Sequence, residues 1–394
     1  MEELNELFEQ SHFLLSITEV SFVRYLYSRI NWDNRLIGIK GARGIGKTTL
    51  LLQRMKQISN RQTALYVTCD HLYFSNHRLF DLATSFAKQG GTYLFIDEIH
   101  KYKGWSKELK MIYDLRPDLN IVFTGSSVLD IDKGEQDDLS RRAVMYDMQG
   151  LSFREYLCMF HGMDAPLLSL DEVLSAKAND MVKLDHPLQF FTSYLQTGYY
   201  PFSKENDFHL RLMQIIERTI ENDIPYYANL NVATANKLKH LLIIISQSAP
   251  FKPNYQSISQ MLDTTRGLLK DYMFYMEKAG LIGQLRDNTG GIRALGKVEK
   301  VYIDNPSLCY LLSDGKPDVG NLRETFFYNQ LRLIANIVSS KTSDFEIDGK
   351  VFEIGGKSKG KKQIQNVAEG YVVKADIEFA YGNTIPLWHF GLLY

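Results

Sequence analysis

The sequence has few cysteines, no long apolar run and almost no net charge. Its 3 cysteines lie far apart and form no C-x-x-C pair, which argues against a disulfide framework or a zinc site. The most apolar run, Leu241 to Ile245, is too short to cross a bilayer. The acidic start, Met1 to Asn5, lacks the features of a signal peptide. We therefore expect a soluble, cytoplasmic protein with no membrane partner.

The near balance of positive and negative charge also limits how the chain could bind nucleic acid. Lys and Arg number 45 against 46 Asp and Glu, so the formal net charge is −1. The chain as a whole is not attracted to nucleic acid, and any DNA contact would need a local basic face. A length of 394 residues exceeds what one hydrophobic core usually organises, and it predicts two or three domains.

Between residues 35 and 150, short apolar runs alternate with amphipathic stretches. This alternation is typical of βαβ units and predicts an α/β fold with a parallel sheet. The runs show little period-two alternation, so we expect every strand to be buried. The expected strands are Arg35–Lys40, Ala64–Thr68, Tyr93–Asp97, Asn120–Thr124 and Val144–Met148.

The first expected strand leads into a complete phosphate-binding motif. Residues 41–48 read G-A-R-G-I-G-K-T and match G-x-x-x-x-G-K-[ST] at each fixed position, with the helical run Thr49–Gln57 following. Glycines let successive backbone N–H groups face phosphates, and a helix N-terminus adds partial positive charge. The sequence therefore predicts a P-loop that binds ATP. The expected nucleotide contacts are Gly41, Ala42, Arg43, Gly44, Ile45, Gly46, Lys47, Thr48 and Thr49.

The chemistry of this site divides among a few side chains. Lys47 would reach the β- and γ-phosphates, and the Thr48 hydroxyl would ligate Mg²⁺. The run Tyr93–Asp97 delivers two carboxylates to the strand end where ligands bind in open α/β sheets. Asp97 suits the Mg²⁺ shell, and Glu98 is placed to orient and deprotonate the attacking water. Most P-loop small-molecule kinases lack such a glutamate, so the pair favours hydrolysis.

The next expected strand, Asn120–Thr124, ends in a cluster of hydroxyls. Thr124 or Ser126 could contact the γ-phosphate or the attacking water from this strand end. A local turn bond explains either hydroxyl equally well. Both interpretations therefore stay open.

Taken in order, these residues resemble the prokaryotic AAA-fold P-loop ATPases that carry a C-terminal domain similar to restriction endonucleases. The resemblance lies in Gly41–Thr48, Asp97–His100 with Trp105 and Lys110, Phe123–Ser127, Leu139–Arg142 and Gly150–Tyr156. It implies an AAA-type parallel-sheet domain that hydrolyses ATP with Mg²⁺. It departs from many members at His100, where they have glutamine, and we expect a solvated, non-catalytic histidine there.

The resemblance also implies an arginine near the end of the ATPase domain that contacts the γ-phosphate in a neighbouring subunit. Arg141 and Arg142 stand at the matching position, and Arg141 is our candidate catalytic finger. Such a residue stabilises charge that develops in the transition state and implies self-association. The alternative is that both are ordinary surface arginines.

The segment after residue 255 has the pattern of a winged helix. Two short apolar helical faces flank a turn at Thr264-Thr265, and the second closes at Gly280 before two expected strands, Leu281–Leu285 and Val298–Ile303. If this module binds DNA, its second helix would enter the major groove. Winged helices also bind proteins, so both partners stay open. The basic residues of the module are Arg266, Lys270, Lys278, Arg286 and Arg293.

The last segment resembles a restriction-type nuclease with an altered active site. Such nucleases need two carboxylates that hold Mg²⁺ beside a lysine, in an acid-x-lysine triplet. Here two extra residues separate Glu353 from Lys357, which puts cleavage in doubt. The candidate acidic residues are Glu324, Asp344, Asp348 and Glu353. We expect the aromatic ending, Trp388–Tyr394, to be a buried terminal strand.

The pattern as a whole predicts a P-loop ATPase whose nucleotide cycle is coupled to its C-terminal domains. The expected domains are the ATPase (1–155), a helical lid or linker (156–235), a winged-helix-like domain (236–320) and a restriction-endonuclease-like domain (321–394). Double-stranded DNA is the candidate partner. The alternatives are a nucleotide-gated protein-interaction switch with negligible turnover and, more weakly, an ATP-dependent nuclease.

Overall fold

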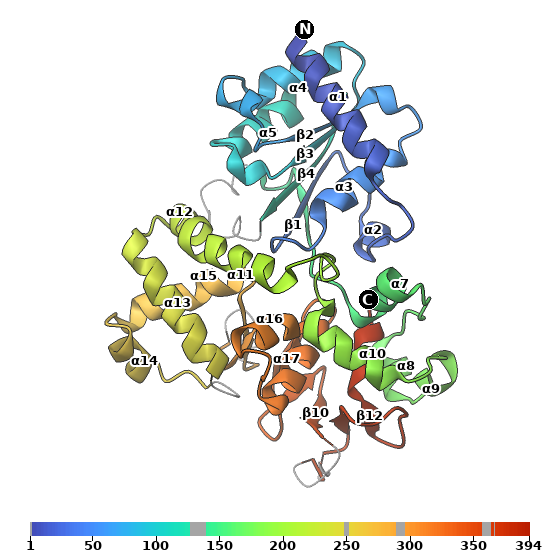
Figure 1. The fold of residues 1–394 in the computed structure, drawn as a ribbon, viewed down its shortest axis with the longest axis vertical. Helices are drawn as coiled ribbons and strands as arrows, with labels where there is room; N and C mark the ends of the chain where they lie inside the picture. The colour runs from blue at the N-terminus through green and yellow to red at the C-terminus, as the bar shows by residue number, and fades with distance from the viewer. Residues whose placement is uncertain (1, 127–138, 248–251, 289–295, 357–363, 366) are drawn as a thin grey trace. The chain divides into compact units, whose positions relative to one another are not determined.

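The computed structural model describes residues 2–126, 139–247, 252–288, 296–356, 364–365 and 367–394. The chain forms two compact units (Figure 1). The first contains Met1–Gln149 and Tyr226–Ala228, and the second contains Gly150–Pro225 and Asn229–Tyr394. Among the described residues, no helix is both long and apolar enough to cross a bilayer.

The first unit is built on a five-stranded sheet with the order β2-β3-β4-β1-β5. All four neighbouring pairs are parallel, as the alternating sequence pattern predicts. The strands are β1 (Leu36–Gly41), β2 (Ala64–Thr68), β3 (Tyr93–Asp97), β4 (Asn120–Ser126) and β5 (Val144–Asp147). Because β4 lies between β1 and β3, its C-terminal end separates the phosphate loop from the Asp97-Glu98 pair.

The expectation that every strand is buried holds for four strands and is wrong for β5. The side chains of β1 to β4 are almost all buried, and they form the core with the helices around them. In β5, Val144 and Met145 are 39% and 40% exposed. The reason is position: β5 pairs only with β1 and is an edge strand of the sheet.

Helices and short turns connect the strands of the first unit. Helix α3 begins directly after the phosphate loop, as the sequence predicts. The helices are α1 (Glu2–Ile17), α2 (Leu26–Arg29), α3 (Lys47–Lys56), α4 (Leu79–Lys88) and α5 (Trp105–Leu115). The 3₁₀ turns are η1 (Arg61–Thr63), η2 (Leu72–Ser75) and η3 (Ile99–Lys101).

The second unit opens with helices, in agreement with the helical segment expected there. Ser152 caps the first of them with a capping box that includes Glu155. The helices are α7 (Phe153–His161), α8 (Leu170–Leu174), α9 (Ala178–Met181), α10 (Pro187–Ser193), α11 (Phe208–Arg218) and α13 (Val232–Gln247), with two π-helical turns, η6 (Tyr194–Gly198) and η7 (Thr219–Asp223). The short helix α12 (Ile224–Ala228) is divided between the units, since Tyr226–Ala228 belong to the first.

Two helices and an antiparallel strand pair then follow in the order predicted from the sequence. They are α14 (Tyr255–Met261), α15 (Arg266–Lys278), β6 (Ile282–Arg286) and β7 (Val298–Ile303). Thr265 caps α15 by accepting a hydrogen bond from the Leu268 N–H. Gly280 has a φ of 73°, a value that favours glycine, and it ends the helix as expected.

The C-terminal segment forms a mixed sheet with the order β12-β11-β10-β9-β8. Its strands are β8 (Ile337–Ser339), β9 (Phe345–Ile347), β10 (Lys350–Gly355), β11 (Gly370–Lys374) and β12 (Thr384–Pro386), with α16 (Pro306–Leu312) and α17 (Val319–Leu331) preceding them. The aromatic ending is buried, but it is a 3₁₀ helix, η10 (Leu387–Leu392), so the expected terminal strand is wrong. Pro386 ends β12 because it cannot donate to a strand ladder.

Candidate nucleotide site

The glycines of the phosphate loop have backbone conformations that a side chain would strain. Gly44 and Gly46 have φ values of 78° and 95°. At Gly41, a Cβ atom would lie only 2.3 Å from the Met148 carbonyl oxygen. The tight turn therefore depends on glycine at these three positions. It leads straight into the N-terminus of α3.

Lys47 is the cation of this loop. Its Nζ donates to the carbonyl oxygens of Gly41 and Ala42 at 2.9 and 2.8 Å. The residue is buried, with 5% of its surface exposed. Its ammonium group is thus held inside the loop. Because the group is shielded from water there, it would attract a phosphate more strongly than an exposed ammonium would.

A buried arginine that was not predicted from the sequence also holds the loop in place. Arg24 donates to the carbonyl oxygen of Ile45 in the loop and to that of Gln149 after β5, both at 2.6 Å. Only 5% of Arg24 is exposed. No motif marks this residue, because it precedes the loop by many positions and its role depends on tertiary contacts.

The Asp97 carboxylate lies at the centre of the site. Oδ2 accepts hydrogen bonds from the Thr48 hydroxyl at 2.5 Å and from the Tyr66 hydroxyl at 2.9 Å. Oδ1 accepts from the Thr124 hydroxyl and from the Glu98 N–H. The structure therefore brings together the two predicted Mg²⁺ ligands, Thr48 and Asp97. A hydroxyl that donates to a carboxylate keeps a lone pair for a cation, so this donor set fits Mg²⁺.

Tyr66, on β2, is a second contributor that sequence reasoning did not identify. Burial raises the pKa of its hydroxyl, and the nearby Asp97 carboxylate raises it further. The hydroxyl therefore stays protonated and continues to donate to Asp97 at ordinary pH. The register of the sheet could have suggested it, since Tyr66 lies on the strand next to β3.

Glu98 follows Asp97 with a backbone φ of 51°, an uncommon value for a residue other than glycine. Its N–H contacts both Asp97 Oδ1 and the Thr124 hydroxyl, at 3.1 and 3.2 Å. Burial raises the pKa of the Glu98 carboxyl, while Lys47 opposes the shift. A raised pKa suits a group that accepts a proton.

The histidine next to this pair is placed differently from the sequence expectation. His100 is buried, and the prediction of a solvated side chain is wrong. Its Nε2 lies 3.2 Å from Glu98 Oε2, and its Nδ1 accepts from the Ser126 N–H at 3.3 Å. The ring is enclosed because η3 packs against the end of β4.

Of the two hydroxyls at the end of β4, that of Thr124 donates to Asp97 and accepts from the Glu98 N–H. The Ser126 N–H donates to His100, whereas its hydroxyl forms no hydrogen bond with another described residue. Ser126 pairs with Gly41 across the sheet, so it lies at the start of the phosphate loop. The hydroxyl of Ser126 is therefore the better placed of the two to contact a phosphate.

The two candidate finger arginines have different surroundings. Arg142 forms a two-pronged ion pair with Asp114, with both N···O distances at 3.0 Å. Arg141 is exposed, has a φ of 65°, and contacts no charged partner among the described residues. Of the two, Arg141 is the one whose guanidinium remains available.

Two acidic residues of the C-terminal segment, Glu324 on α17 and Asp344 just before β9, contact a lysine from β7. Lys300 Nζ lies 2.9 Å from Glu324 Oε2 and 3.1 Å from Asp344 Oδ1. Glu353 is fully buried and accepts from the Ser343 hydroxyl. Lys357, expected to complete a nuclease site, lies outside the described residues. The described residues contain no group of three or more His, Cys, Asp or Glu arranged to hold a metal.

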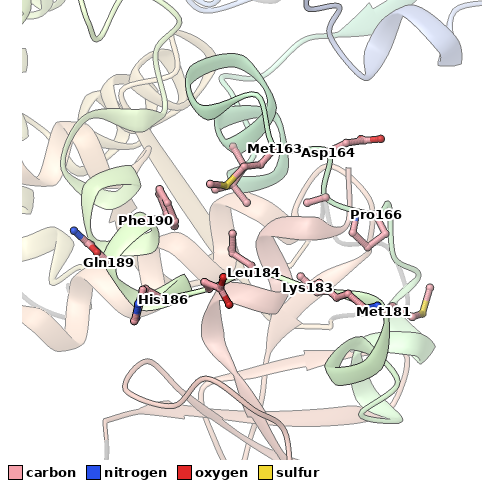
Figure 2. A pocket seen from close by; sticks show the side chains of 13 residues that line it. Met163, Asp164, Pro166, Met181, Lys183, Leu184, His186, Gln189 and Phe190 are labelled. Carbon is pink, nitrogen blue, oxygen red and sulfur yellow. The ribbon is translucent and has the colours of Figure 1, made fainter.

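The second unit also has a pocket that the sequence did not suggest. It encloses about 540 Å³ among the segment after α7, the segment around Lys183 and the start of α10 (Figure 2). Its wall is largely apolar, with Met163, Leu184 and Phe190 among the labelled side chains. It contains none of the predicted site residues.

Comparison with known proteins agrees with the site at the level of the domain. Residues 33–157 match the family described as AAA domain, and residues 189–318 match a family described as a domain of unknown function. The chain carries an AAA-type domain over these residues. This match covers the phosphate loop, the Asp97-Glu98 pair and all five strands of the first sheet.

Relatives add little beyond this. An uncharacterized protein of Methanocaldococcus jannaschii is 28% identical over an alignment of 273 residues that covers 64% of this chain and 57% of that relative. Among solved structures, C. elegans PCH-2 is 17% identical with a TM-score of 0.29, covering 53% of this chain and 67% of its own. AMPPCP-bound DnaA from Aquifex aeolicus is 14% identical with a TM-score of 0.26, covering 64% and 84%. TM-scores this low carry no argument about function.

Proposed function

We propose that this protein is a Mg²⁺-dependent ATP hydrolase whose nucleotide cycle acts on its second unit. The observation that carries the proposal is the Asp97 carboxylate. It accepts the Thr48 hydroxyl from the phosphate loop at 2.5 Å, and Glu98 follows directly in the chain. A metal ligand pair and a proton acceptor thus meet at the carboxyl end of one parallel sheet.

Binding would use the phosphate loop and its cation. The N–H groups of the loop and the N-terminus of α3 would hold the phosphates, and Lys47 would neutralise their charge. Thr48 and Asp97 would hold Mg²⁺, which supplies a positive charge beside the phosphoanhydride bond.

Hydrolysis would use Glu98 as the general base. Its carboxylate accepts a proton from water as the water oxygen attacks the terminal phosphorus and the bond to ADP breaks. The raised pKa of Glu98 favours this role, because the group binds a proton more readily than an exposed glutamate. A nucleotide-gated switch with negligible turnover would not need this carboxylate.

Arg141 would act on the nucleotide of a neighbouring copy. Its exposed guanidinium, with no charged partner among the described residues, supports the role. A cation supplied in this way stabilises charge on the transferred phosphoryl group. Turnover would then require self-association.

The partner of the second unit is proposed to be duplex DNA, contacted through α15. The order α14, α15, β6 and β7 is that of a winged helix, and Arg266 and Lys270 are exposed on α15. A protein partner is the second candidate, favoured by the exposed Met261 and Leu268, at 68% and 44%. Arg286 also forms an ion pair with Glu277 at 2.7 Å. Its charge is therefore offset, and one fewer cation faces a DNA phosphate.

The nuclease alternative is less well supported. In the described residues Glu324 and Asp344 direct their carboxylates at Lys300, so an ammonium occupies the position between them. A Mg²⁺ ion there would have to compete with that fixed charge. We therefore propose that this segment serves assembly or binding.

Steady-state ATP hydrolysis by the wild type and Lys47→Ala tests the proposal. We expect Mg²⁺-dependent turnover in the wild type, and its loss in Lys47→Ala together with ATP affinity. No phosphate release by the wild type, despite tight ATP binding with and without DNA, would contradict hydrolysis and leave the nucleotide-gated switch.

A further inference from the structure

A buried histidine connects the proposed base to the end of the neighbouring strand. His100 lies in η3, directly after the Asp97-Glu98 pair, and its side chain has no exposed surface. One ring nitrogen faces Glu98 and the other faces the backbone of Ser126, at the end of β4. The solvated, non-catalytic histidine expected from the sequence would not make these contacts.

The contact with Ser126 determines where the imidazole carries its proton. A backbone N–H can only donate, so Nδ1, which lies 3.3 Å from the Ser126 nitrogen, must be the unprotonated acceptor. A neutral ring then carries its hydrogen on Nε2. That N–H lies on the side of the ring that faces Glu98.

The Nε2 hydrogen is therefore available to one oxygen of the base. His100 Nε2 lies 3.2 Å from Glu98 Oε2, within hydrogen-bonding distance, although the pair is not aligned as a linear hydrogen bond. Arg43 NH1 approaches the same oxygen at 3.9 Å. Both N–H groups thus lie on the side of Oε2, and Oε1 is the oxygen that we assign to accept a proton from water.

We propose that His100 is a positioning residue that holds the Glu98 carboxylate in its working orientation, anchored by the Ser126 N–H. The inference rests on the proposed hydrolysis, because a positioned base matters only if Glu98 acts as one. Ser126 also pairs with Gly41 of the phosphate loop. The end of β4 therefore contacts the loop on one side and orients the base on the other.

Two substitutions separate positioning from simple packing. In His100→Asn, the amide can still accept from Ser126 but is too short to reach Glu98. In His100→Gln, the side chain carries an acceptor and an N–H donor separated by one carbon, as the two nitrogens of the imidazole are. Both fill most of the buried volume, so the comparison does not depend on an empty cavity.

The experiment measures kcat and, separately, equilibrium ATP affinity for the wild type, both His100 variants and Glu98→Gln. We expect His100→Asn to lower kcat about tenfold or more, within the range for a misplaced general base, with little change in ATP affinity. We expect His100→Gln to recover most of the wild-type kcat. The matched control is His77→Gln, a half-buried histidine of the same unit that stacks on Tyr73 away from the site.

Unchanged kcat in His100→Asn would overturn the inference. So would an equal loss in the Asn and Gln variants, because the donor would then be irrelevant. These outcomes differ from failure of the proposed function, which would appear as equal turnover in the wild type and Glu98→Gln.

Discussion

Among single residues, Asp97 organises more of the candidate site than any motif suggests. Its two oxygens receive hydrogen bonds from three hydroxyls, on β2, β4 and α3, and from the backbone N–H of Glu98, the residue that follows β3. A carboxylate held this way is oriented before a cation reaches it, which reduces the ordering that binding requires. The site is therefore precise because of the residues around Asp97.

The two arginines after Leu139 allow a test at the same scale. Arg141→Ala should keep ATP affinity but lose turnover by a factor of about 10³ or more, the usual contribution of an arginine finger. Arg142→Ala should change turnover little, because Arg142 is paired with Asp114 on the same unit. The measurement is steady-state phosphate release at several protein concentrations, since a finger acts between copies.

Mixing Arg141→Ala with Glu98→Gln provides a further check. If a finger acts between subunits, mixed assemblies should recover part of the activity. Equal and unchanged hydrolysis in both arginine variants would contradict the finger.

At the scale of elements, α15 is the surface through which the second unit is proposed to contact DNA. Arg266 and Lys270 are exposed on it, while Lys278 lies near its end beside the Phe274 ring. So few exposed cations on α15 would contact only a few DNA phosphates. The expected dependence of binding on salt is correspondingly shallow.

The prediction for α15 is a change in that salt dependence. Replacing Arg266 by Ala should weaken duplex binding and reduce the slope of log affinity against log salt by about one, and Lys270→Ala should do the same. Arg211→Ala, on α11 and paired with Glu205, is the control. Binding with no salt slope in the wild type would favour the protein partner.

Elements also show where sequence reasoning works. The phosphate loop, β1 to β4, α15 and its cap follow from local signals: apolar runs, glycines and a threonine before a helix. The exposed edge β5 and the 3₁₀ ending did not follow, because burial and pairing depend on neighbours distant in the chain. Arg24, Tyr66 and the buried position of His100 were missed for the same reason, since each is defined by tertiary contacts.

At the scale of the whole molecule, the stability of the second unit depends on pH through a histidine buried near the C-terminus. Its C-terminal 3₁₀ helix is buried, and His389 within it is 1% exposed with Trp388 packed against its ring at 4.2 Å. Burial lowers the pKa of His389 to about 3. The folded state therefore keeps this imidazole neutral over a range where the unfolded chain takes up a proton.

This difference predicts a pH-dependent stability. Because the unfolded state binds more protons below about pH 6.5, stability falls as the pH falls from there toward 3. Between pH 7 and 5, the contribution of one such histidine is about 2 kcal/mol. His389→Phe should remove this pH-dependent contribution to the free energy of unfolding. The thermal midpoint of the variant should therefore drop less than that of the wild type when the pH is lowered from 7 to 5.

The exposed His240→Phe serves as the control and should behave like the wild type. An identical pH response in the wild type and His389→Phe would show that burial of His389 does not drive the effect.

Whether Glu98 makes this chain an ATP hydrolase can be tested by one comparison. Steady-state ATP hydrolysis by wild type and Glu98→Gln is compared with Mg²⁺, with and without duplex DNA, while ATP affinity is measured in parallel. We expect equal ATP binding, a loss of turnover in the variant of about 10²-fold or more, and stimulation of the wild type by DNA. Equal turnover in the two proteins would contradict that expectation.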